Sequence, residues 1–503
     1  MENKKQAQEN TNNQPTKDVN VIDVGSVNRK NGQYVCPYCG ASEIQPNPKT
    51  GKLRCNYCFS EFDGKNINNI SDISSLQGLT RGKGTENINA DSNDVVTLKC
   101  GGCGAEVVID TASAPNARCH WCRSILSINQ RMENGAIPDA ILPFKLQKNV
   151  AQQKIDYFVK KRTFFANPKF KKEFTTNNIM GVYFPYMLVD ANCHAIFKGQ
   201  GEHLIRRYTV GSGDNKKTRY DADLYNVERE FDILIDDLSI ESSSKRLDKT
   251  SNKETNNIIN SIMPFDTENC IQYESNYLVG YTSERRDVNI EDLGKKVNSQ
   301  FRDISRYAAK DDATFYDRGI RWDQEDVIVK GTQWIAAYLP VWLYSYLEVK
   351  GDKKLLHYVA VNARTGETMG SIPINKPLLF LVSAIVEVLC VILLFILSSG
   401  ADEDSDGLIL LLAGGFVFYF VMKLRYRNSN ARHTYEKETK KNVQNIRRVD
   451  QLVRREKGLS NAHMIGANHL KIEGEKPISK DTTGKKIINN INMTKDNNEK
   501  EKR

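Results

Sequence analysis

Eight cysteines form two copies of one spacing pattern. The first copy is Cys36-Pro-Tyr-Cys39, then fifteen residues, then Cys55-Asn-Tyr-Cys58; the second is Cys100-Gly-Gly-Cys103, then fifteen residues, then Cys119-His-Trp-Cys122. Each copy reads C-x2-C-x15-C-x2-C, which is typical of a four-cysteine zinc site. Two thiolates on a tight turn supply two corners of a tetrahedron, and a second turn, brought back by a hairpin, supplies the other two. The sequence therefore predicts two small zinc ribbons.

The residues around the cysteines favour a structural metal. Gly40 and Gly104 follow the first turn of each copy, where a residue without Cβ allows a sharp bend. A disulfide framework would need a secreted chain, and we expect no signal peptide because the first ten residues contain no apolar h-region. Iron held in a rubredoxin-like manner is the alternative to zinc. Because protein ligands fill all four positions, we predict two structural Zn²⁺ ions and no catalytic metal.

Length and composition limit how many domains the chain can form and which compartment suits it. At 503 residues, with 40% hydrophobic and 26% charged residues, the chain has room for about three globular domains. Eleven cysteines are too few for a disulfide scaffold of this length, so we expect a reducing compartment around the ribbons.

The N-terminal part divides by composition. Residues 1–32 are rich in Asn, Gln and Lys and are predicted to be disordered. The first ribbon is expected at 33–63 and the second at 95–128, joined by a polar linker over 64–94. Units this small lack a sufficient core, so the metal supplies most of their folding free energy.

Residues 137–375 contain a hidden repeat. Ile141-Leu142-Pro143-Phe144 is echoed by Ile262-Met263-Pro264-Phe265, and Tyr183-Phe184-Pro185 is echoed by Tyr338-Leu339-Pro340. A helical pattern at 147–162 follows the first Pro-Phe pair, and strand patterns follow each Tyr-x-Pro. Two motifs repeated in the same order indicate duplication rather than chance recurrence. We predict a duplicated α+β cytoplasmic domain.

Two apolar runs, 378–398 and 407–422, follow this domain. The first is long enough to cross a bilayer core of about 30 Å. A short acidic segment separates them, whereas Lys376, Lys423 and Arg425 lie at their outer ends. The positive-inside rule then predicts a two-helix transmembrane hairpin over 377–424 in the cell membrane, with both termini cytoplasmic. The basic tail, 425–503, is predicted to be mostly disordered, and its first part either lies on anionic lipid or forms a solvated helix.

Glu387 lies near the middle of the first apolar run. A carboxylate within a membrane span is a candidate functional residue. The alternative is a protonated Glu that bonds the partner helix, where antiparallel counting puts Tyr419 at its level. We favour the alternative, because no Lys or Arg accompanies Glu387 within the spans.

The sequence offers no catalytic motif. It contains no Walker loop, no Gly-x-Ser-x-Gly and no dinucleotide fingerprint. His194 and His203 share no metal-ligand spacing with a third residue, and Asp236 and Asp237 resemble ordinary turn or surface carboxylates. We therefore expect no enzyme activity.

The chain resembles a bacterial family of transcription-factor-IIB-type zinc-ribbon membrane proteins, whose members are often named primosomal-helicase-like. The likeness covers about 95–425 and is carried by Cys100-Gly-Gly-Cys103 with Cys119-His-Trp-Cys122, Leu142-Pro143-Phe144-Lys145, Gly181-Val182-Tyr183-Phe184-Pro185, Met263-Pro264-Phe265-Asp266, Leu339-Pro340-Val341-Trp342 and Asn362-Ala363-Arg364-Thr365-Gly366. The resemblance implies architecture more than function. The sequence contains no ATP-binding loop that would support the helicase name.

Together these features predict a multidomain chain: two small four-cysteine zinc ribbons, a duplicated α+β domain and an α-helical transmembrane hairpin. The leading hypothesis is a membrane-anchored scaffold whose ribbons bind a protein partner and whose spans contact lipid. The alternative is nucleic-acid binding through the first ribbon, where Lys49, Lys52, Arg54, Tyr38 and Tyr57 form a thin basic and aromatic patch.

Overall fold

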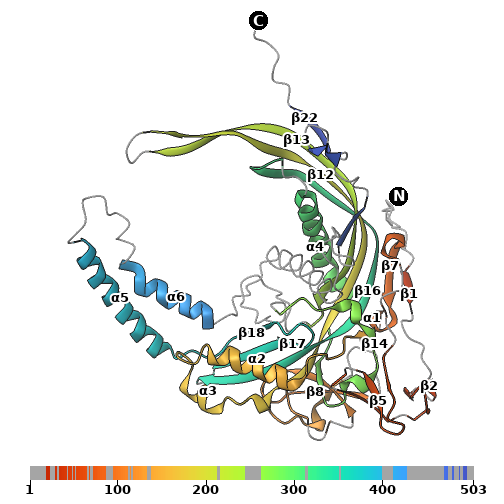
Figure 1. The fold of residues 1–503 in the computed structure, drawn as a ribbon. Coiled ribbons are helices and arrows are strands. Elements are labelled where there is room, and N and C mark those ends of the chain that lie inside the picture. The colour runs from red at the N-terminus through yellow and green to blue at the C-terminus, as the bar shows by residue number, and fades with distance from the viewer. Residues whose placement is uncertain are drawn as a thin grey trace, which may run out of the picture.

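The computed structural model of the chain is shown as a ribbon in Figure 1. The described residues are most of 36–64, 72–86, 94–111, 117–132, 137–211, 216–243, 262–311, 315–350, 353–398 and 412–426, together with Ile67, Ala114 and short strands at 19–22, 29–30, 33–34 and between 470 and 495.

Fifteen of the described strands form one mixed sheet, with β1-β7-β16-β12-β15-β9-β8-β10 as its main order. They are β1 (Val19–Ile22), β7 (Gly78–Gly82), β8 (Val95–Lys99), β9 (Glu106–Asp110), β10 (Arg131–Met132), β11 (Ala140–Ile141), β12 (Met180–Val210), β13 (Lys217–Glu241), β14 (Ile271–Gln272), β15 (Thr282–Glu284), β16 (Gly319–Lys350), β17 (Lys353–Asn362), β18 (Thr368–Gly370), β19 (Leu470–Glu473) and β22 (Ile491–Lys495). The helices are α1 (Lys83–Glu86), α2 (Lys148–Lys160), α3 (Pro168–Glu173), α4 (Ile290–Asp311), α5 (Lys376–Ser398) and α6 (Gly414–Tyr426).

Three smaller sheets lie outside this one. A three-stranded sheet of β4 (Ile44–Pro46), β5 (Leu53–Cys55) and β6 (Glu61–Phe62) carries the first cysteine cluster. The two-stranded sheets pair β2 (Arg29–Lys30) with β3 (Gln33–Tyr34), and β20 (Ser479–Lys480) with β21 (Lys486–Ile487).

The two Tyr-x-Pro motifs lie opposite each other in the centre of the main sheet. Strands β12 and β16 pair antiparallel, with Tyr183 opposite Pro340 and Pro185 opposite Tyr338. Besides pairing with each other, β12 and β16 each pair with further strands on their other side. At Pro185 this other neighbour of β12 changes from β15 to β13, and at Pro340 that of β16 changes from β11 to β17. Proline has no N–H to donate, so a central strand tolerates a proline at such a break in the hydrogen-bond ladder.

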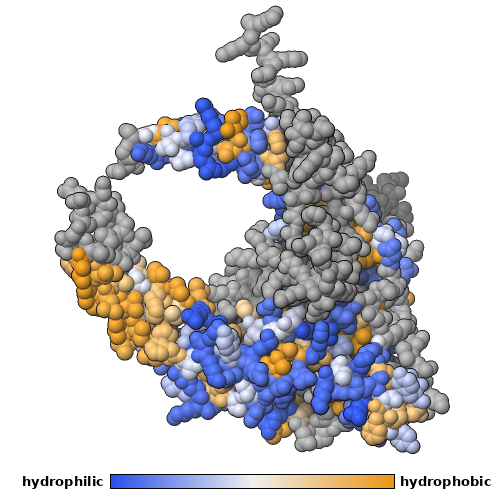
Figure 2. All heavy atoms as spheres, in the orientation of Figure 1, coloured by the Kyte–Doolittle hydropathy of each residue, from blue (hydrophilic) through white to orange (hydrophobic). Residues whose placement is uncertain are grey.

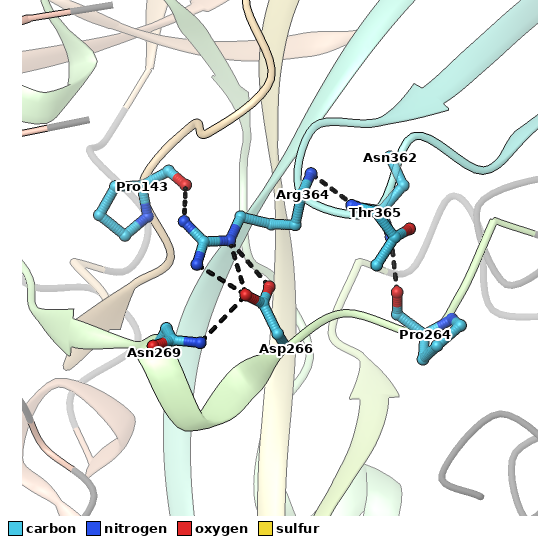
Figure 3. Close-up of polar contacts among 7 residues, drawn as sticks. All are labelled: Pro143, Pro264, Asp266, Asn269, Asn362, Arg364 and Thr365. Atoms are coloured by element: carbon cyan, nitrogen blue, oxygen red, sulfur yellow. Dashed lines mark hydrogen bonds and ion pairs between the residues drawn. The ribbon is translucent and has the colours of Figure 1, made fainter. Parts of the chain in front are cut away.

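The two Pro-Phe motifs are joined by the turn after β17 (Figure 3). Arg364 donates to both carboxylate oxygens of Asp266, at 2.6–3.0 Å, and to the carbonyl oxygen of Pro143 at 3.1 Å. The Asn362 amide donates to the carbonyl oxygen of Pro264 at 2.7 Å. One turn therefore holds two segments that lie more than a hundred residues apart in sequence.

The sheet divides the core into layers. Along β12, Val182, Phe184, Tyr186 and Leu188 face the apolar cluster that contains the second ribbon. Tyr183 belongs to the cluster beneath α2 and α3, and Met187 and Val189 face α4. Beyond this body, β12 and β13 continue as a long curved hairpin, and α5 and α6 project as a pair (Figure 1).

The segment over 64–94, predicted as a linker, contributes to the body. Strand β7 joins β16 in parallel, from Gly331 opposite Gly78 to Trp334 opposite Arg81. The short helix α1 supplies the N–H groups of Gly84 and Thr85 to the buried carboxylate of Asp139. Backbone hydrogen bonds therefore attach this part of the range to the body, which the polar composition did not indicate.

The predictions of disorder over 1–32 and 425–503 fall mostly on positions outside the described residues. Where the structure describes these ranges, β1 pairs with β7, and β19 and β22 pair with β13.

Candidate metal centres and the membrane helix

All four cysteine turns share one backbone geometry. In the turn that starts at Cys100, the Cys100 N–H donates to the carbonyl oxygen of Ala105, and the Gly104 N–H donates to the carbonyl oxygen of Cys100. The turns that start at Cys36, Cys55 and Cys119 repeat both bonds. The fifth residue of each turn has a positive φ: Gly40 (74°), Phe59 (61°), Gly104 (75°) and Arg123 (64°).

The sequence indicated only half of these left-handed positions. Glycine marks the first turn of each ribbon, as expected, but Phe59 and Arg123 occupy the same position in the second turns. Non-glycine residues adopt this conformation at a cost of about 1–2 kcal/mol, so the surrounding fold and the metal must hold it.

The sulfur positions fit a tetrahedral metal ion. In each cluster all four Sγ atoms lie within 4.8 Å of one another. Cys36 and Cys58 are 3.6 Å apart, as are Cys39 and Cys55, and the corresponding distances in the second cluster are 3.4 and 3.5 Å. A tetrahedral zinc ion with Zn–S bonds of about 2.3 Å separates its sulfurs by about 3.8 Å. Both clusters are therefore compatible with structural zinc.

Close contact between the thiols shifts their pKa values in opposite directions. Contact with Cys119 lowers the pKa of Cys103 to about 5, and the same contact raises the pKa of Cys119 far above its usual range. Hydrogen bonding to Ser60 lowers the pKa of Cys58 to about 6. Zinc is bound by thiolates, so its entry into either cluster must displace the remaining thiol protons.

We expect Gly104→Ala to weaken metal binding by the second cluster. A Cβ at Gly104 meets no atom within 4 Å, so the only cost is the left-handed backbone, about 1–2 kcal/mol. Competition with a chelator should then show a metal affinity lower by about fivefold to thirtyfold. Gly294→Ala is the matched control, because that glycine lies in α4 with equally open space and no positive φ. Equal affinity in both variants would contradict the strained-turn explanation.

The second ribbon is built into the body. Its strand β9 pairs with β15, and the residues between its last two cysteines point into the core. Trp121 donates its indole N–H to Glu284 at 2.6 Å, the His120 ring nitrogen lies 3.1 Å from the hydroxyl of Thr282, and Ser345 donates to the carbonyl oxygen of His120. His120 is 0% exposed and Trp121 is 8% exposed.

The first ribbon presents the aromatic residues of its cysteine turns to solvent. Tyr38 and Tyr57 occupy the two x-x segments of its cysteine turns and are 68% and 77% exposed. Phe59 is also exposed, and the guanidinium of Arg54 lies 5.4 Å from its ring centre. The opposite side of this ribbon is buried, because Ile44 belongs to the same apolar cluster as Ile271, Tyr273 and Tyr277.

The other sequence candidates are distributed over the long hairpin. His194 bonds Asp232 at 2.7 Å and Glu230 at 2.9 Å, and His203 bonds the carbonyl oxygen of Phe315. Neither histidine belongs to a group of possible metal ligands among the described residues.

One acidic group was missed by the sequence analysis. Asp190 lies beside Asp236 and Asp237 at a bulge of β12, and its carboxylate accepts the Asp237 N–H at 2.7 Å. Burial raises the pKa of Asp190 to about 7. Only the register of β12 and β13 brings these residues together, so no local sequence signal could have indicated the group.

One helix in the described part of the chain is long and apolar enough to cross a membrane. It is Lys376–Ile396 within α5, and 11% of its most apolar stretch is buried. Figure 2 shows α5 and α6 as a hydrophobic projection. The second predicted span is not supported, because α6 has 13 residues where about 20 are needed. Residues 407–411 of that prediction lie outside the described residues.

Glu387 bonds the partner helix, as the favoured alternative predicted, but at a different level from the one expected. Its carboxylate accepts the backbone N–H of Gly415 at 2.6 Å, one helical turn before Tyr419. The bond joins α5 to the first turn of α6, where N–H groups lack intrahelical acceptors.

Comparisons with known proteins give one distant relative. Uncharacterized protein YdjG of Bacillus subtilis (strain 168) is 24% identical over 350 residues, which cover 68% of this chain and 90% of that protein. No protein-family model matches the chain, and no solved structure matches it.

Proposed function

We propose that this chain is a non-catalytic, membrane-anchored binding protein whose first ribbon recruits a protein partner. The observation that carries the proposal is the difference between two ribbons with the same ligand spacing. Between the last two cysteines of the second ribbon, His120 and Trp121 are buried against β15 and β16, whereas their counterparts in the first ribbon, Asn56 and Tyr57, are exposed. Tyr38, in the other turn of the first ribbon, is exposed as well. Exposed aromatic side chains on a rigid, metal-held turn are suited to anchor a protein interface.

The charge of the first ribbon favours a protein partner over nucleic acid. Residues 36–64 contain three basic residues, Lys49, Lys52 and Arg54, and three acidic residues, Glu43, Glu61 and Asp63. Lys52 is paired with Asp63 at 2.8 Å. Nucleic-acid binding needs an excess of positive charge and shows a steep salt dependence. Binding of RNA or DNA to this ribbon at low salt would favour the alternative function.

The anchoring part of the proposal places α5 in the cell membrane and makes α6 the returning arm of a hairpin, with both termini in the cytoplasm. Support comes from the charges at the base of the pair. Lys376 begins α5, and Lys423 and Arg425 lie in the last turn of α6, so the basic ends lie together beside the body. This arrangement agrees with the positive-inside rule for a cytoplasmic body.

We expect Tyr38→Ala/Tyr57→Ala to lose the partner while keeping both metal ions. The test is crosslinking and capture from the detergent-solubilised full-length protein, with metal content measured on the same samples. A protein captured by the wild type should decrease by more than tenfold in the variant, because two central anchors each contribute about 1 kcal/mol or more.

Tyr220→Ala on the long hairpin is the control for loss of an exposed tyrosine, and it should retain the partner. A partner list that is the same in the wild type and in Tyr38→Ala/Tyr57→Ala would refute recruitment by the first ribbon.

A further inference from the structure

The connection between α2 and α3 lies against the base of the apolar helices. The Phe165 carbonyl oxygen accepts the Asn375 N–H at 2.8 Å, just before α5, and the Phe165 N–H donates to the hydroxyl of Tyr426 at the end of α6. Arg162 donates to the carbonyl oxygen of Arg425 at 3.0 Å. These bonds place the connection level with the first turn of α5.

This connection and its flanks carry a concentrated positive charge. Residues 157–172, which we name the basic elbow, contain six basic residues and no acidic residue. The basic residues are Lys160, Lys161, Arg162, Lys169, Lys171 and Lys172. Within the described part of the chain, Lys169, Lys171 and Lys172 form no ion pair, and all three are exposed.

An exposed aromatic residue lies at the centre of the elbow. Phe164 is 66% exposed, although its neighbour Phe165 is buried against Tyr426 and Phe418. One turn into α5, Phe380 is exposed too. Figure 2 shows the surface changing from hydrophobic on α5 and α6 to hydrophilic over α2 and α3. Aromatic rings and basic side chains are the residues that favour the interface between hydrocarbon and headgroups.

We propose that the basic elbow is a binding surface for anionic lipid headgroups, in which Phe164 enters the interface and Lys169, Lys171 and Lys172 contact the lipid phosphates. The inference rests on the proposed function, since it requires α5 to lie in the bilayer. Continuity with the apolar surface of α5 selects lipid as the occupant. The elbow fixes the orientation of the body relative to the membrane. It thereby also fixes the orientation of the first ribbon, which packs against the body.

The test places a photocrosslinker at Phe164, as p-benzoylphenylalanine, in the full-length protein in nanodiscs of mixed phosphatidylglycerol and phosphatidylcholine. Lipid adducts are counted by mass spectrometry. We expect adducts with a preference for phosphatidylglycerol, and K169Q/K171Q/K172Q should lower that preference by about a hundredfold, because each lysine contributes about fivefold.

Two controls match this design. K295Q/K310Q removes two exposed lysines from α4 and should leave the preference unchanged. The same crosslinker at Ile328, an exposed residue of β16, should give no lipid adduct.

Three results would overturn the inference. The first concerns a protein that resists extraction from its native membrane by alkaline carbonate. If it gives no adduct at Phe164, or if K169Q/K171Q/K172Q keeps the wild-type preference for phosphatidylglycerol, the elbow does not bind anionic lipid. The second is release by carbonate, which would refute the anchoring proposal as well. The third is loss of the adduct on adding RNA, which would assign the elbow to nucleic acid instead.

Discussion

Replacing Cys100 and Cys103 by serine is expected to unfold the body of the protein, whereas replacing Cys36 and Cys39 is expected to unfold only the first ribbon. Structural zinc supplies about 10–16 kcal/mol of apparent binding free energy in small zinc domains, which is as large as the whole stability of a typical domain. In this chain the second ribbon shares β9, His120 and Trp121 with the main core, so its loss is transmitted to the sheet.

The chain offers a selective probe for this difference. Its four tryptophans, Trp121, Trp322, Trp334 and Trp342, all lie outside the first ribbon. Thermal unfolding followed by tryptophan fluorescence in detergent therefore reports the body and the second ribbon, without a contribution from the first ribbon. We expect Cys100→Ser/Cys103→Ser to lower the Tm by roughly 10 °C or more and Cys36→Ser/Cys39→Ser to change it by a few degrees at most, at about 2–4 °C per kcal/mol.

Metal analysis completes the experiment. Each double variant should contain one metal ion fewer per chain than the wild type, and elemental analysis of the wild type distinguishes zinc from iron. Equal shifts in Tm for the two variants would show that both ribbons support the body equally, contrary to the pairing of the second ribbon with the main sheet.

Arg364→Ala is expected to lower the free energy of unfolding by about 3 kcal/mol. Removing one partner of a largely buried, bidentate ion pair leaves the other charge uncompensated. Among the described residues, only the Asn269 amide would remain as a side-chain donor to Asp266. The carbonyl oxygen of Pro143 would also lose a hydrogen bond that joins the two Pro-Phe motifs. Urea unfolding monitored by tryptophan fluorescence measures the loss.

A double-mutant cycle separates the ion pair from packing. Arg364→Met/Asp266→Leu should cost less than the sum of Arg364→Met and Asp266→Leu measured singly, because the double variant leaves no unpaired charge. Additive costs would show that the two side chains act independently. Arg364→Lys should fall between wild type and Arg364→Ala, because lysine keeps the charge but cannot form the bidentate contact.

The membrane prediction shows how far local sequence signals extend. The apolar run at 378–398 predicted a helix, and α5 confirms one helix of suitable length and composition. The second run was counted as a span on its composition, but α6 begins only at Gly414, where the Glu387 carboxylate of α5 accepts the Gly415 N–H. That contact belongs to the helix pair and not to either segment alone.

The sequence alone determined the two cysteine clusters. A metal site made from two turns depends on spacing within about twenty residues, and such local spacing is visible in any sequence. The same spacing carries no information on what lies beside each turn. Tertiary structure decided that His120 and Trp121 would be buried while Tyr38 and Tyr57 remained exposed, because burial depends on the strands that pack against each ribbon. Those strands lie more than a hundred residues away from the second ribbon, and their pairing is set by the fold of the whole sheet.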